Sequence, residues 1–154
     1  MDDLILARAF HVIGVVIWIG GVAMVTAVLL PARFRSLDQH LEAFELIERR
    51  FSWIARAMTV LVGATGLYMT WKMHLWDRFS EPSFWWMHAM VCIWFIFSTV
   101  LFVAEPLFLH QLFLDRARIN PKTTLKVMKT AHWILLIASL LTIGGAVAGS
   151  HGWL

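Results

Sequence analysis

The sequence predicts an all-α integral membrane protein, a four-helix bundle with both termini on the outer, periplasmic side. Of its 154 residues, 60% are hydrophobic and only 15% are charged, whereas a soluble domain is nearer half apolar and a quarter charged. The apolar residues fall in four blocks, each near or above the ~20 residues that a helix needs to cross a bilayer. Because a backbone in lipid must satisfy its own hydrogen bonds, each block is expected to be a helix.

The four blocks predict spans at about residues 4–30, 51–71, 84–109 and 127–147, within one domain of residues 1–154. Pro31 ends the first block, and Gly149 and Gly152 follow the last. Asp2 and Asp3 stand where a signal peptide would carry basic residues, so we expect the first block to remain in the mature protein. In the first connection, residues 38–48 carry apolar residues at every third position (41, 44 and 47) with acidic residues between them, which predicts a short amphipathic helix at the membrane interface.

Charge in the connections predicts the orientation. Ten basic residues lie in or beside the first and third connections, against three on the other side. Basic residues accumulate in cytoplasmic loops, which places both termini outside. We read the net charge of +3 as a consequence of this topology rather than of nucleic-acid binding. The single cysteine, Cys92, excludes an intrachain disulfide and a multi-thiolate metal site.

Three histidines fall inside predicted spans, where an ionisable side chain is costly and is expected to face a partner. His11 lies about 10 Å and His88 about 6 Å from the outer ends of their spans, counted at 1.5 Å per residue. Two imidazoles at similar depth on parallel helices suit axial ligation of one b-type haem. His132 enters its span from the inside and is the reserve metal ligand. The competing interpretation of each is a hydrogen bond to a carbonyl or hydroxyl of a neighbouring helix.

Small residues and cations around these histidines fit the same hypothesis. Gly14 and Trp18 share a helix face with His11, and Gly63 and Gly66 give the second span a small-residue surface. Such a surface permits close helix packing, and it equally admits a flat macrocycle. The outer-side cations that could pair with haem propionates are Arg8, Lys72 and Arg78. No CxxCH motif is present, which excludes c-type attachment.

Copper handling remains open as an alternative function, because imidazole and thioether groups on the outer side are acceptable copper ligands. These groups are His11, His74, His88 and His151 with Met69, Met73, Met87 and Met90.

Glu105 is the acid inside a predicted span. It is expected to form an ion pair with Arg33, Arg50 or Arg56, or to relay protons.

Several short motifs resemble the bacterial J-type protoporphyrinogen oxidase family, which is related to the copper-resistance D (CopD-like) membrane domains. They are RAFHVIGVVIWIGG at 8–21, LPARF at 30–34, IERRF at 47–51, Gly66-Leu67 and WMH at 86–88. The resemblance implies a multi-pass protein of the bacterial inner membrane. It also implies haem binding by the histidines of the first and third spans, which match His11 and His88.

The sequence departs from that family at two places. Met90 stands where the enzymes carry a lysine regarded as important to the oxidase, and the stretch ending in His132 replaces an Asn-Glu-Val-Pro-like segment. Protoporphyrinogen oxidation is therefore disfavoured, while haem binding is untouched. The leading hypothesis is a cytochrome b-like electron-transfer protein in membrane lipid, with a quinol or redox protein as partner and a tendency to form homo-oligomers.

Overall fold

The structure is a computed structural model that describes residues 2–31, 41–109 and 121–152, and these residues form helices joined by short turns, with no strand among them. The chain begins with α1 (Asp2–Met24), which continues as the π-helical segment η1 (Val25–Leu29). After α3 (Leu41–Lys72), two short 3₁₀ helices follow, η2 (Leu75–Ser80) and η3 (Pro82–Phe84). Then α4 (Trp85–Thr99) continues as the π-helical segment η4 (Val100–Leu109), and α6 (Pro121–Ser150) is last.

In the part of the chain that the structure describes, three stretches are long and apolar enough to cross a membrane: Asp2–Leu29, Pro82–Leu107 and Lys126–Ser150. They correspond to the first, third and fourth predicted spans, so the predicted all-α class is confirmed and three of the four predicted spans are helices able to cross a membrane. The helix α3 is long enough as well, at 32 residues, but it is not among these stretches. Its apolar residues are interrupted by Arg56, Thr59 and Thr65, which make polar contacts to their own and neighbouring helices.

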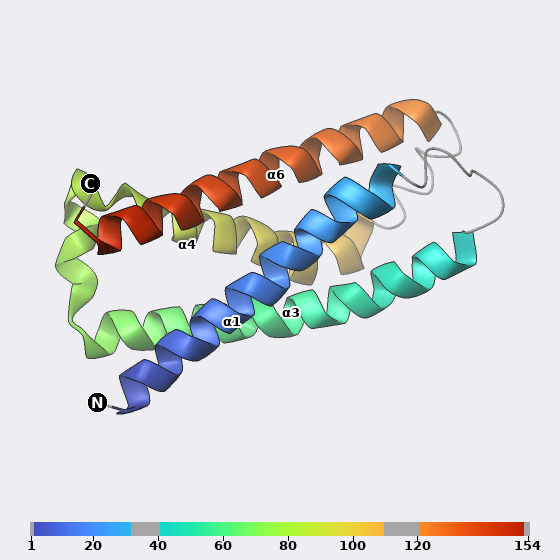
Figure 1. The fold of residues 1–154 in the computed structure, drawn as a ribbon. Helices are drawn as coiled ribbons and strands as arrows, with labels where there is room; N and C mark the ends of the chain where they lie inside the picture. The colour runs from blue at the N-terminus through green and yellow to red at the C-terminus, as the bar shows by residue number, and fades with distance from the viewer. Residues whose placement is uncertain (1, 32–40, 110–120, 153–154) are drawn as a thin grey trace.

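The long helices lie side by side, with α1 (blue) running along α3 (green) and α4 (yellow) along α6 (orange to red) (Figure 1). The Asp2 end of α1 and the Ser150 end of α6 lie at the same end of the molecule (Figure 1). The start of α4 also lies toward this end (Figure 1), so α1 and α4 run in the same direction, as the depth comparison of His11 and His88 requires.

The core lies where all four long helices meet. Its buried residues are Trp18, Ile19, Val22, Ala55, Val62, Phe97 and Leu136. At its centre the Trp18 ring meets the Phe97 ring edge-on, with 4.9 Å between centroids. Glycine allows the close approach of α1 and α3, because a Cβ at Gly14 would lie 2.8 Å from a methyl group of Val62. Small residues serve helix packing in lipid in this way.

The helix expected in the first connection is continuous with α3, which already begins at Leu41; residues 38–40 lie outside the described part. The segments η1 and η4 have π-helical hydrogen bonding. η1 ends two residues before Pro31, and η4 contains Pro106. Such segments are rare and are usually a single turn long.

Candidate functional site

The imidazole of His11 is held by the inward face of α3. Its Nδ1 atom lies 3.1 Å from the carbonyl oxygen of Val62 and 3.0 Å from Oγ1 of Thr65. A carbonyl can only accept, and the Thr65 hydroxyl donates to the Leu61 carbonyl at 2.7 Å. Both partners therefore accept from His11, which assigns the proton of a neutral imidazole to Nδ1 and leaves Nε2 with its lone pair.

The hydrogen bond from Nδ1 is of the kind that accompanies metal binding by histidine. A histidine that binds a metal usually donates its other ring N–H to a backbone carbonyl or carboxylate, which fixes the ring and raises the basicity of the ligating nitrogen. His11 has that second hydrogen bond already in place. Gly66 makes room for the ring, since a Cβ there would lie 3.2 Å from Cε1 of His11.

The predicted small-residue surface of α3 is filled by protein side chains. A Cβ at Gly63 would lie 2.6 Å from the indole ring of Trp94, and that indole donates its N–H to the Thr59 carbonyl at 2.9 Å. Gly14 faces Val62, and Gly66 faces His11 itself. In this arrangement these glycines serve helix packing, so a macrocycle would have to displace Trp94 to lie on Gly63.

His88 has a separate partner. Its Nε2 atom lies 3.0 Å from the carbonyl oxygen of Phe79 in η2, and the Phe79 ring packs edge-on against the imidazole at 5.5 Å. The side chain is exposed on the first turn of α4. Within the described residues no interaction joins His88 to His11, so the structure gives the two predicted ligands different hydrogen-bond partners.

Of the remaining predicted site residues, His132 and Arg78 have partners of their own, and Arg8 lies one helical turn before His11 on α1. The Nδ1 atom of His132 bonds the Met128 carbonyl one turn earlier on its own helix, at 2.9 Å. Arg8 is exposed on α1, and the Arg78 guanidinium lies 4.8 Å from the centre of the Phe84 ring. Across residues 2–31, 41–109 and 121–152, no three His, Cys, Asp or Glu side chains are grouped as a metal site. His40 and His110 fall outside those ranges.

Trp18, predicted on the cofactor face of α1, is 3% exposed. Its indole N–H is buried and has no acceptor among the described residues. Leaving a buried donor unpaired costs about 1–3 kcal/mol. Trp18 therefore presents an unused hydrogen-bond donor at the contact of α1 with α4.

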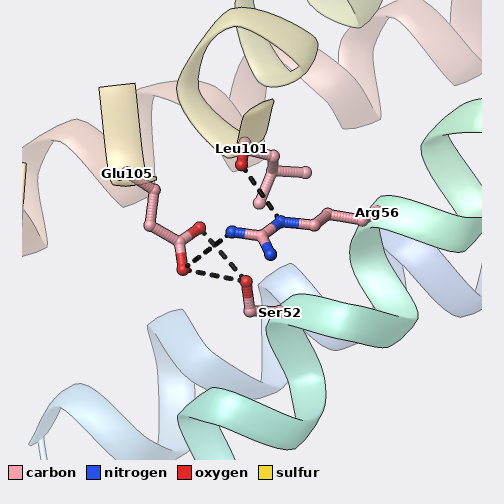
Figure 2. Close-up of polar contacts among 4 residues, drawn as sticks. All are labelled: Ser52, Arg56, Leu101 and Glu105. Carbon is pink, nitrogen blue, oxygen red and sulfur yellow. Dashed lines mark hydrogen bonds and ion pairs between the residues drawn. The ribbon is translucent and has the colours of Figure 1, made fainter. Parts of the chain in front are cut away.

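A second polar cluster lies between α3 and the π-helical part of the third span (Figure 2). Glu105 is paired with Arg56, with 3.5 Å between Oε1 and Nη2, so the expected ion pair is confirmed with Arg56 as its cation. Ser52 donates to the same carboxylate, 2.9 Å from Oε1 and 3.1 Å from Oε2. The Arg56 Nε–H group donates to the Leu101 carbonyl at 3.1 Å.

Ser52 and the Leu101 carbonyl were not predicted as members of this cluster. Ser52 lies one helical turn before Arg56, and this four-residue spacing on one helix face was the available signal. The role of the Leu101 carbonyl carries no such signal, because it depends on the hydrogen-bond register of η4. Arg56 also lies over the Trp53 ring at 5.2 Å, so its guanidinium is held on several sides.

These features define the class of the protein: among the described residues it is all-helical, with three helices long and apolar enough to cross a membrane and with polar side chains held between the helices. The chain belongs to the family described as a domain of unknown function (DUF4149), whose sequence model matches residues 13–112, more than half of the chain. The match contains Arg56, His88 and Glu105, and it begins just after His11. No curated protein matches the chain, and neither does any solved structure.

Proposed function

We propose that this protein binds b-type haem in the bacterial inner membrane, with His11 as the axial ligand contributed by α1. The observation that carries the proposal is the state of His11 inside an apolar span. Its Nδ1–H group is held by α3, and its Nε2 lone pair remains available to coordinate iron. The cofactor would supply one-electron redox chemistry, with a potential set by ligand identity and burial.

The proposed topology has α3 as a fourth span and both termini outside. The shared end of the Asp2 and Ser150 termini (Figure 1) and the bias of ten basic residues against three support it. His11 and His88 then both lie toward the outer surface, on helices that run in the same direction. Electrons would enter from a quinol or a redox protein.

The residues fit a haem in part. His11 fits as a ligand, and the unpaired Trp18 indole provides a donor between α1 and α4. His88 fits as the second ligand only if its Nε2 leaves the Phe79 carbonyl or if its Nδ1 is used. A haem with two protein ligands has no open position and favours electron transfer, whereas one held by His11 alone would keep an open position.

The deciding experiment is the absorption spectrum of the purified full-length protein, oxidised and then reduced, from cells supplied with a haem precursor. We expect a Soret band with sharp α and β bands on reduction. His11→Ala should abolish haem binding. His88→Ala should convert the low-spin spectrum to a high-spin one, because one ligand is lost. His132→Ala is the matched control, since its ring bonds a carbonyl of its own helix, and it should retain the wild-type spectrum.

Two outcomes would replace the proposal. A colourless protein that retains stoichiometric copper, lost in His11→Ala, would favour copper handling through the outer-side histidines and methionines. A wild-type spectrum in both His11→Ala and His88→Ala would remove these residues as ligands. Turnover of protoporphyrinogen is not expected, because Met90 stands in place of the lysine of the oxidases that the sequence resembles.

A further inference from the structure

The hydrogen-bond register of η4 leaves one carbonyl without its normal donor. In a π-helix each N–H donates to the carbonyl five residues earlier, so the donor for Leu101 would be residue 106. That residue is Pro106, which has no N–H. In an α-helix, with its four-residue step, the carbonyl left open would instead be that of Phe102.

The Leu101 carbonyl is nevertheless satisfied. The Arg56 Nε–H group reaches from α3 and donates to it at 3.1 Å (Figure 2). The arginine therefore occupies the place of the amide hydrogen that Pro106 lacks, and it does so only for the π-helical register. An unpaired carbonyl in hydrocarbon would cost several kcal/mol, so this single contact distinguishes between two registers of the same segment.

The register determines where Glu105 points. A π-helix has more residues per turn than an α-helix, so each residue advances by a smaller angle, and the two forms diverge by roughly a quarter turn over five residues. Glu105 lies five residues after the start of η4 at Val100. In the π-helical form its carboxylate meets Ser52 and Arg56; in the α-helical form it would be turned away from α3.

We propose that Arg56 is a latch that holds the inner half of the third span in its π-helical register and so keeps Glu105 turned toward α3. Release of the Arg56–Leu101 contact lets residues 100–105 return to the α-helical register, which rotates the carboxylate away from Ser52. The device thus has two states of one helix segment, selected by one side chain. It is independent of the proposed haem site, because its hydrogen bonds and ion pair do not involve His11.

The test is a double-mutant cycle in the full-length protein in lipid nanodiscs, read by hydrogen–deuterium exchange of residues 98–105. Arg56→Met removes the donor at similar length, and we expect about tenfold faster exchange in this segment. Pro106→Ala restores the missing amide. In that background Arg56→Met should change the exchange by less than about twofold.

Two further variants separate the latch from simpler roles. Arg50→Met is the matched control, since Arg50 is exposed on the same helix, and it should leave exchange unchanged. Glu105→Gln removes the ion pair but leaves the Leu101 contact. If Arg56 acted through the ion pair alone, Glu105→Gln would reproduce Arg56→Met and Pro106→Ala would not rescue it.

Equal acceleration by Arg56→Met in the wild-type and Pro106→Ala backgrounds would overturn the proposal. If Arg56→Met folds only together with Pro106→Ala, the coupling is shown by that rescue. If neither protein folds while Arg50→Met does, a restored amide does not replace the arginine, and the latch is rejected.

Discussion

Trp94 of α4 donates its indole N–H to the backbone carbonyl of Thr59 on α3, at 2.9 Å. The ring that makes this bond also fills the space over Gly63. Together with the Arg56–Leu101 and Ser52–Glu105 contacts, it joins α3 to the third span at several levels along one face. Long side chains thus connect the α1–α3 and α4–α6 pairs.

Trp94→Phe should lower the free energy of unfolding by at least about 1 kcal/mol, because the hydrogen bond to Thr59 is lost together with part of the indole that lies over Gly63. Thermal unfolding in detergent, monitored by far-ultraviolet circular dichroism, measures the change. Trp71→Phe is the control, since the Trp71 side chain is exposed. Equal unfolding temperatures for wild type and Trp94→Phe would show that the bond contributes nothing.

Gly66→Ala and Gly144→Ala should have opposite effects. A Cβ at Gly66 would press against the His11 ring at 3.2 Å, whereas nothing lies within 4 Å of one at Gly144. Alanine in an open helical position is favourable by up to about 1 kcal/mol. We therefore expect Gly144→Ala to raise the unfolding temperature and Gly66→Ala to lower it and shift the His11 imidazole resonances. A stabilising Gly66→Ala would mean that the ring is not seated there.

Ser52→Ala should destabilise the protein by about 1 kcal/mol, because the partly exposed Glu105 carboxylate loses a donor that contacts both of its oxygens. Ser139→Ala is a suitable control, since Ser139 bonds the Leu135 carbonyl of its own helix. Chemical denaturation of the two variants compares them directly. A larger loss for Ser139→Ala would contradict the importance of the Glu105 cluster.

The orientation can be tested with reporter fusions at the C-terminus. Alkaline phosphatase, which is active only in the periplasm, should be active there, and a fluorescent reporter that folds only in the cytoplasm should be dark. A fusion within the third connection, at residues 110–120, should give the reverse pattern. A fluorescent C-terminal fusion would place the termini inside and would exclude the proposed four-span topology with outer ends.

The sequence predicted three of the helices from hydropathy alone, because α1 with η1, α4 with η4, and α6 each contain a long apolar stretch. It also placed Glu105 near an arginine, because both charges fall toward the same end of their spans. The start of α3 was less predictable. Hydropathy placed the beginning of the second span at Phe51, but the helix already begins at Leu41 and runs through the charged residues between them.

The candidate site was harder to predict, because side-chain direction depends on neighbouring helices. Depth alone matched His11 with His88, yet His11 turns toward Val62 and Thr65 of α3, and His88 turns toward Phe79 in a connection with 3₁₀ geometry. Neither partner can be inferred from spacing within a span. The π-helical register of η4 is equally hidden, since it depends on Arg56 as well as on Pro106.

The wide turns of η1 and η4 are places where the chain can lose one residue without a change in the packing of the helices. A π-helical turn accommodates one residue more than an α-helical turn. Removing a single residue from 100–104 could therefore tighten one turn and leave the helix faces on either side of it in place. The same deletion inside α1 or α6 would rotate every later side chain by about 100°. Length differences between homologues that keep this packing should accordingly be concentrated in the two wide-turn segments and in the connections.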